Sequence, residues 1–148
     1  MVVMYMDENT YIENRINEQI NFYEKKSKLN KNCYYISKLL EICFGAVIPV
    51  VSGFFVDNCW SSITVAILGV LIAVSASING VFKFQEKWIY YRITIEQLKR
   101  EMNLFLSKSG VYLDKDAPSN FNLFVENCEG ILSSENSAWK QYQDSKSK

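Results

Sequence analysis

The stretch of sequence that decides the fold is SSITVAILGVLIAVSASINGVF, which runs from Ser61 to Phe82. It contains 22 residues and no charged side chain. A helix needs about 20 predominantly apolar residues to cross the roughly 30 Å hydrocarbon core of a bilayer. The surface of a water-soluble domain, by contrast, must be solvated by polar and charged groups. The segment 61–82 therefore predicts a transmembrane helix.

A second apolar segment precedes it. Residues 36–56 read ISKLLEICFGAVIPVVSGFFV, and their only charges, Lys38 and Glu41, lie near the N-terminal end, where long side chains can reach the membrane surface. Only Asp-Asn-Cys-Trp, residues 57–60, separates the two segments, which predicts a tight turn between antiparallel helices. We therefore predict a transmembrane hairpin. The alternative is a buried hairpin in a soluble helical bundle, but a chain of 148 residues has little sequence left to cover both segments on all sides.

The layout of charge predicts the orientation. All 16 basic residues and 15 of the 16 acidic residues lie outside residues 42–82, and the turn contains no Lys or Arg. Basic residues flank the other ends of both spans: Lys25, Lys26, Lys28, Lys31 and Lys38 on one side, and Lys83, Lys87, Arg92, Lys99 and Arg100 on the other. Because positive charge is retained in the cytoplasm, we predict a multi-pass protein of the cell (inner or plasma) membrane with both termini cytoplasmic.

Helical patterns continue on the polar side of both spans. Residues 10–35 and 83–107 predict helices that extend the hairpin as a cytoplasmic stalk, and residues 119–142 predict a third, amphipathic helix. The expected fold is all-α, in a single domain of residues 1–148. Apolar residues at steps of three and four mark the expected core faces: Ile12, Ile16, Ile20 and Tyr23; Val81, Phe84, Trp88, Tyr91, Ile95, Leu98, Met102 and Phe105; Phe121, Phe124, Cys128, Ile131 and Ala138, with Val125, Leu132 and Trp139 beside them.

Local signals predict where these helices end. Thr10 and Glu13 have the spacing of a capping box, in which each side chain binds a free backbone N–H at the start of a helix. Gly110 is expected to close the second helix, because glycine readily adopts the left-handed conformation found after helix ends. A hairpin centred in the turn also places Glu18 level with Lys99, as an ion pair between two stalk helices.

The composition argues against catalysis. The sequence has no histidine, which removes the commonest general base and metal ligand. Its four cysteines include no Cys-x-x-Cys pair, so Cys33, Cys43 and Cys128 are interpreted as apolar fillers. Cys59, in the turn, is interpreted as a free thiol or as a residue that meets its copy in another subunit. Net charge is zero with acids and bases interleaved, which does not indicate a nucleic-acid-binding surface. We expect no enzyme activity, no cofactor and no metal site. Structural roles are expected for Tyr112, Glu126, Glu129 and Glu135.

Several segments beyond the hairpin resemble a known family. They are Leu98–Glu101 with Phe105, Ser109–Tyr112, Leu123–Glu126, and then Glu129, Ile131, Glu135 and Trp139. With the two-span hairpin, they make nearly the whole chain similar to SLATT proteins, the SMODS- and SLOG-associating two-transmembrane effectors. The resemblance implies a membrane effector of bacterial conflict systems that damages or opens the membrane. It also implies a nucleotide-producing or nucleotide-sensing partner protein.

Two functions fit the sequence. In the first, several hairpins form a homo-oligomeric pore in the lipid bilayer, because two helices alone cannot enclose a water path. Candidate helix-packing positions form a small-residue stripe: Ala66, Gly69, Ala73, Ala76 and Gly80. Candidate pore-lining residues are Thr64, Ser75, Asn79 and Glu41, and Pro49 is expected to bend the first span.

Glu41 has a second interpretation, in which it pairs with Lys38 or Lys83 at the membrane surface. The second function is a membrane-anchored helical scaffold that binds a cytoplasmic partner without forming a pore. A pore should respond to substitution of Asn79 or Glu41, whereas a scaffold should respond to substitutions in the stalk.

Overall fold

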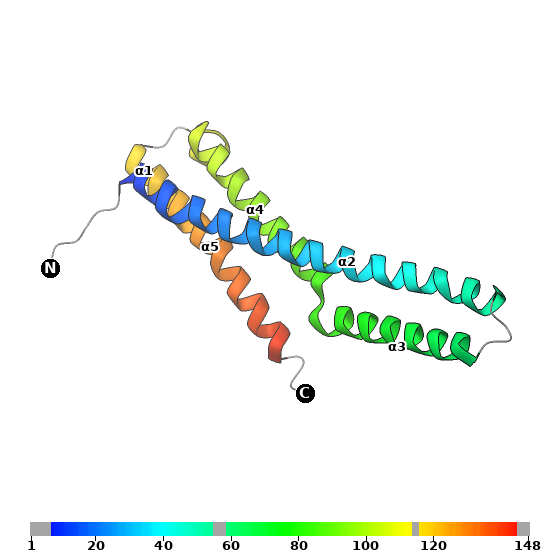
Figure 1. Ribbon diagram of the computed structural model, residues 1–148. Coiled ribbons are helices and arrows are strands. Elements are labelled where there is room, and N and C mark those ends of the chain that lie inside the picture. Colours follow the sequence, from blue (N-terminus) through cyan, green and yellow to red (C-terminus); the bar gives the residue numbers. More distant parts are fainter. Residues whose placement is uncertain (1–6, 55–58, 114–115, 145–148) are drawn as a thin grey trace. The chain divides into compact units, whose positions relative to one another are not determined.

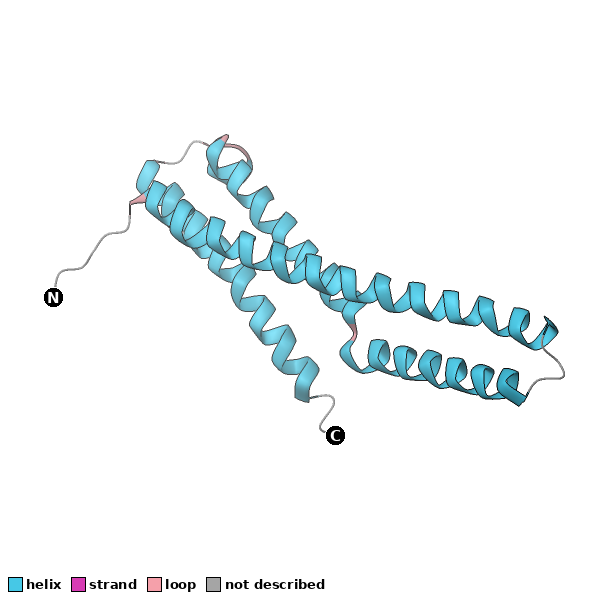
Figure 2. Ribbon diagram, in the orientation of Figure 1, coloured by secondary structure: helices cyan, strands magenta, loops and turns pink. Residues whose placement is uncertain are grey.

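The computed structural model describes residues 7–54, 59–113 and 116–144, and this part of the chain contains helices and no strand (Figure 2). The regular elements, in chain order, are α1 (Glu8–Tyr11), a π-helical turn (Ile12–Asn17), α2 (Glu18–Phe54), α3 (Cys59–Phe82), α4 (Phe84–Leu106), a 3-10 turn (Gly110–Tyr112) and α5 (Ala117–Asp144). The prediction of an all-α fold is confirmed for the described residues.

The chain divides into two compact units. We call Lys26–Ile89 the hairpin unit, and Met1–Lys25 together with Tyr90–Lys148 the three-helix unit. α2 and α4 each contribute to both units, whereas α3 lies in the hairpin unit and α5 in the three-helix unit.

In the hairpin unit, α2 and α3 lie side by side (Figure 1). Partly buried residues recur at steps of four and three on both helices and form the seam between them. These residues are Ser37, Glu41, Phe44, Ile48 and Val51 on α2, and Val65, Leu68, Ile72, Ser75 and Asn79 on α3. The spacing is that of helices that keep one face turned toward each other over successive turns.

The remaining faces of this hairpin are apolar and exposed. Two helical stretches, Glu8–Phe54 and Trp60–Tyr112, are long and apolar enough to cross a membrane. In each, none of the most apolar 18-residue window is buried. Large side chains such as Ile42, Val70 and Val81 are more than 60 % exposed, so the protein itself does not cover these segments. A buried hairpin in a soluble bundle does not fit this exposure.

α3 and α4 are separated by a single residue in the left-handed conformation. Lys83 has φ of 48°, although it is neither glycine nor asparagine. Its N–H still donates to the carbonyl of Asn79 at 3.0 Å, and its carbonyl accepts from the N–H of Lys87 at 3.1 Å. The sequence predicts a helix that continues from the second span into the stalk, and this break interrupts it.

The three-helix unit encloses the main apolar core. Its buried members come from the N-terminal helices, α4, the 3-10 turn and α5. They are Tyr11, Ile16, Ile20, Tyr23, Ile95, Leu98, Phe105, Tyr112, Phe124, Cys128 and Leu132. Phe105 and Phe124 stack at its centre, with ring centroids 4.3 Å apart. Members of all three predicted apolar stripes take part in this core, whereas Val81, the first residue of the second stripe, lies outside it and is 65 % exposed.

Two predicted helix ends are wrong. Thr10 lies inside α1, which begins at Glu8 after Asp7, so it does not cap a helix. α4 ends at Leu106 and is closed by Lys108, which has φ of 50°; the N–H of Lys108 donates to Phe105 and that of Ser109 to Leu104, both at 3.0 Å. This bond pattern is a Schellman motif with lysine where glycine is usual.

Gly110 does adopt a left-handed φ of 66°, but it opens the following 3-10 turn. The helix predicted at 119–142 corresponds to α5, Ala117–Asp144, which begins two residues earlier and ends two residues later. In the predicted turn, residues 57 and 58 lie outside the described part of the chain, and α3 already includes Cys59 and Trp60.

The predicted ion pair between Glu18 and Lys99 is also replaced. Lys99 Nζ lies 2.7 Å from a carboxylate oxygen of Glu24, nearly two turns further along the same helix. The pairing of Glu18 with Lys99 is calculated for two helices that run without interruption from the turn. The break at Lys83 interrupts the second helix, so the predicted pairing of residues no longer applies below it.

Candidate functional site

The most distinctive polar site lies in the apolar hairpin unit, at the seam between α2 and α3. Glu41 Oε2 accepts a hydrogen bond from Lys38 Nζ at 2.7 Å, one turn away on α2. Its other oxygen, Oε1, accepts from Asn79 Nδ2 of α3 at 3.2 Å. Only 14 % of the Glu41 side chain is exposed. A carboxylate so poorly hydrated requires such partners, because burying an unpaired charge costs several kcal/mol.

Ser75 and Asn79 extend this cluster along α3. Ser75 Oγ donates to the backbone carbonyl of Ser37 at 3.3 Å, one turn before Glu41 on α2. Asn79 Oδ1 is buried and has no hydrogen-bond donor among the described residues. The two side chains thus connect the helices, and Asn79 retains one unused acceptor.

The structure separates the four pore-lining candidates into two groups. Glu41, Ser75 and Asn79 come together in the seam of a single chain. Thr64 lies apart from them on the exposed face of α3, and its hydroxyl donates to the carbonyl of Trp60 at 2.8 Å. Of the two interpretations of Glu41, the geometry contains the ion pair with Lys38.

The small-residue stripe lies outside the seam. Ala66, Gly69, Ala73, Ala76 and Gly80 are all exposed, and a Cβ placed on Gly69 or Gly80 would meet nothing within 4 Å. These positions therefore take no part in packing α3 against α2 of the same chain. α2 continues through Pro49 as one helix, and the bend expected there stays a prediction.

A second polar cluster lies in the three-helix unit, around Glu129. Arg15 donates from Nε and one terminal nitrogen to the two oxygens of Glu129, both at 3.0 Å, and the hydroxyl of Tyr11 donates to it at 3.2 Å. The Arg15 hydrogen bonds hold the pKa of Glu129 below its usual range. Burial raises the pKa of Tyr11, and the Glu129 charge adds to this effect. The cluster fixes α5 to the π-helical turn that carries Arg15.

The 3-10 turn carries the third cluster. The hydroxyl of Tyr112 donates a short hydrogen bond to Glu101 Oε1, and Asn127 Nδ2 donates to the same oxygen at 2.7 Å. The Tyr112 side chain is 1 % exposed, and burial raises its pKa. Nearby Cys128 is fully buried, and burial raises the pKa of its thiol to about 12. A protonated, inaccessible thiol of this kind is an apolar filler, as the sequence predicts.

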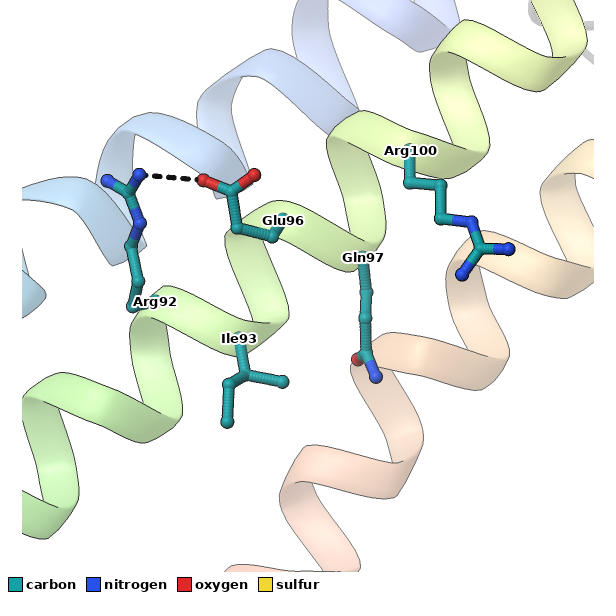
Figure 3. Close-up of a pocket in the computed structure, with 5 residues that line it drawn as sticks. All are labelled: Arg92, Ile93, Glu96, Gln97 and Arg100. Atoms are coloured by element: carbon teal, nitrogen blue, oxygen red, sulfur yellow. Dashed lines mark ion pairs between the residues drawn. The ribbon is translucent and has the colours of Figure 1, made fainter.

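One open depression on the described surface lies on α4. It is lined by Arg92, Ile93, Glu96, Gln97 and Arg100, and Figure 3 shows Arg92 and Glu96 reaching toward each other, 2.9 Å apart. Among the described residues, no group of three or more acidic or sulfur side chains is placed to hold a metal ion.

Sequence reasoning missed the partners in these clusters. It assigned structural roles to Tyr112 and Glu129 but not the residues that bind them, Arg15, Glu101 and Asn127. The signal available was weak: Glu101 and Asn127 interrupt or border apolar faces of two predicted helices, where a polar side chain needs a partner.

Comparison with known protein families gives one match. The family model described as "Protein of unknown function (DUF4231)" covers residues 18–120. The chain belongs to the DUF4231 family. The match to DUF4231 covers the hairpin unit, all of α4 and the 3-10 turn with Tyr112, and it ends in the first turn of α5. No curated protein and no solved structure matches this DUF4231 chain. The family assignment leaves the resemblance to SLATT proteins neither supported nor opposed.

Proposed function

We propose that this chain is an integral membrane protein whose hairpin unit crosses the lipid bilayer twice, with both termini in the cytoplasm. The observation that supports this most is the exposure of both apolar segments, neither of which is buried by the rest of the chain. Apolar surface of this extent would drive aggregation in water, whereas lipid tails solvate it. The lysine-rich flanks and the turn without basic residues support the orientation.

Extraction of membranes at alkaline pH tests the first part. An integral protein stays in the membrane pellet, whereas release into the supernatant would contradict insertion. Labelling of Cys43, which is exposed within the first apolar segment, provides a residue-level test. A membrane-impermeant maleimide should not react with Cys43 in intact membranes and should react after denaturation in detergent.

We further propose that the chain assembles into a homo-oligomer that conducts ions and uses no catalytic chemistry. The open small-residue face of α3 supports close approach of a second helix, because such faces allow backbones to pack tightly in membranes. Thr64 on the exposed face and the Glu41–Asn79 cluster supply polar groups for a water path. An acidic group near one mouth would favour cations.

Ionic current from purified protein in planar bilayers tests conduction. Wild type is compared with Asn79→Leu and Glu41→Gln, and Ser133→Ala, an exposed residue of α5, serves as the matched control. Discrete currents that change in the first two variants and not in the control support a pore. Absence of current at all voltages, with and without added nucleotides, would contradict it.

A scaffold is the second candidate function, and one observation favours it. Leu106, Val111 and Leu113 are each more than half exposed near the turn that follows α4, in the three-helix unit. Exposed apolar groups of this kind are typical of sites that bind another protein. If Leu106→Ser abolishes function in cells while Asn79→Leu does not, the scaffold replaces the pore.

The resemblance to SLATT proteins adds a biological role to the proposal, as a membrane effector of a bacterial conflict system with a nucleotide-producing or nucleotide-sensing partner. Inducible expression in a bacterial host tests it. Loss of membrane potential on expression together with the partner supports an effector. Normal growth and potential under those conditions would contradict it.

A further inference from the structure

One end of the hairpin unit combines lysines with aromatic rings. Residues 26–35 contain Lys26, Lys28 and Lys31 and no acid, immediately before the first apolar segment. Tyr34 and Tyr35 follow on the same helix, with ring centroids 5.6 Å apart. Phe82 and Phe84, on either side of the break at Lys83, stack at 5.5 Å. Aromatic rings beside cations are typical of the headgroup region of a membrane.

Lys31 lies close to two aromatic rings, one on each helix. Its ammonium lies 5.9 Å from the ring centroid of Tyr35 and 6.0 Å from that of Trp88, which belongs to α4. Both distances are in the range of a cation–π contact. The hydroxyl of Ser27 donates to the carbonyl of Trp88 at 3.1 Å and connects the two helices at this level. The ammonium therefore lies beside aromatic rings of both helices, and Lys28 lies one turn away on the same side of α2.

Trp88 has a polar group that the described residues leave unused. Its indole Nε1 is buried and has no hydrogen-bond acceptor among them. Buried N–H groups normally have a partner. The indole N–H is itself enclosed, so the groups that a headgroup oxygen can reach at this end of the hairpin are the exposed lysines beside it, Lys28 and Lys31.

We propose that this end of the hairpin, defined by Lys28, Lys31, Tyr35 and Trp88, binds the phosphate headgroups of anionic phospholipids in preference to zwitterionic ones. The inference rests on the proposed membrane insertion and adds the lipid class. Lysines next to a membrane surface each contribute about 1 kcal/mol of attraction to anionic lipid, which corresponds to roughly a five-fold change in relative binding. The opposite end of the hairpin provides a contrast, because Trp60 is 76 % exposed beside a turn without Lys or Arg.

Tryptophan quenching by brominated lipids tests the proposal on the full chain. One variant keeps only Trp88 (Trp60→Phe, Trp139→Phe) and the other keeps only Trp60 (Trp88→Phe, Trp139→Phe). Each is reconstituted in phosphatidylcholine vesicles with an equal mole fraction of dibrominated phosphatidylcholine or dibrominated phosphatidylglycerol. At Trp88 we expect the anionic lipid to have a relative binding constant at least five-fold higher. At Trp60 the two lipids should quench equally.

Substitutions identify the groups responsible. Lys28→Gln with Lys31→Gln should reduce the preference at Trp88 to near one, while Lys28→Arg with Lys31→Arg should retain it. Lys108→Gln removes one positive charge from the three-helix unit, outside the proposed site, and should change nothing. Far-UV circular dichroism of each variant checks that the helices are intact.

The possible outcomes separate the two proposals. Equal quenching of Trp88 by both lipids, or a preference that survives removal of both lysines, would overturn the anionic-lipid site and leave membrane insertion standing. Quenching of neither tryptophan by either lipid would mean that the hairpin lies outside the bilayer, which overturns the proposed function itself.

Discussion

Replacing Lys83 by glycine should stabilise the protein relative to replacing it by alanine. Lys83 has φ of 48° in the single-residue break between α3 and α4. The left-handed conformation costs a residue with a Cβ about 1–2 kcal/mol, and glycine avoids this cost. Glycine in turn loses more backbone entropy on folding, about 0.5–1 kcal/mol. The expected difference between Lys83→Gly and Lys83→Ala is therefore about 0.5–1 kcal/mol in favour of glycine.

Both variants remove the same side-chain contact. Lys83 Nζ lies 3.3 Å from a carboxylate oxygen of Glu86 whose side chain is 64 % exposed, and a pair this accessible contributes about 0.5 kcal/mol or less. Comparing glycine with alanine cancels this term. The free energy of unfolding is measured in mixed micelles by titration with a denaturing detergent, with helicity followed by circular dichroism.

An alanine variant as stable as the glycine variant, or more stable, would refute the reasoning. It would mean that α3 and α4 run on as one helix through residue 83, in which glycine is the poorer residue. Lys108, with φ of 50° in the Schellman motif after α4, is the matched position. Lys108→Gly should have a higher free energy of unfolding than Lys108→Ala by a similar amount, whatever the result at Lys83.

Three further predictions concern the three-helix unit. Tyr112→Phe removes a hydrogen bond to Glu101 and should lower the free energy of unfolding by about 1.5 kcal/mol, measured by denaturant titration; a loss below about 0.3 kcal/mol would show that the bond is unimportant. The pKa of Glu129 is lowered by Arg15, so the pair stabilises the fold above pH 4.5 and the stabilisation is lost as pH falls through the folded-state pKa. The free energy of unfolding of the wild type should thus exceed that of Arg15→Gln by about 0.5–1 kcal/mol at pH 7 and by less at pH 3. Arg92→Gln removes an exposed ion pair within α4, and as a control its free energy of unfolding should differ little from that of the wild type at either pH. Burial raises the pKa of Cys128 from 9.0 to about 12, so its protonated form stabilises the fold below pH 9 and this contribution is lost as pH rises toward 12. The thermal unfolding temperature of Cys128→Ala should therefore fall less at alkaline pH than that of the wild type. The same pH dependence in both proteins would contradict the assignment.

The features that sequence reasoning predicted are those that depend on periodicity and on long uncharged segments. Ile16, Leu98 and Phe124 belong to three separate apolar stripes, and all three are at most 1 % exposed in one core. The two apolar segments are predictable because each is long and almost free of charge, which is typical of a helix surrounded by lipid. Predictions from periodicity and from long apolar segments rest on many residues, so one atypical residue does not change them.

The features that were missed depend on single residues. Residue 83 itself is neither glycine nor asparagine, so the left-handed position carries no signal of its own, and Gly80 lies three residues before it inside α3. Lys108 takes the cap position that Gly110, two residues later, was expected to fill. The π-helical turn at Ile12–Asn17 inserts an extra residue into a helix whose sequence contains no irregularity. In each case the backbone conformation of one or a few residues differs from what their type prefers, and propensities of single residues are too weak to predict it.

The pairing of Glu41 with Asn79 also bears on how the chain is made. The first span emerges from the ribosome with Lys38 and Glu41 inside its boundaries, and it is the less apolar of the two segments. A translocon that sampled it alone would meet the Lys38–Glu41 ion pair without the further hydrogen bond that Asn79 of α3 provides. Ionised residues disfavour transfer of a nascent helix into lipid. On the proposed topology, we therefore expect the first span to enter the bilayer more favourably together with the second span, whose Asn79 gives Glu41 an additional hydrogen bond.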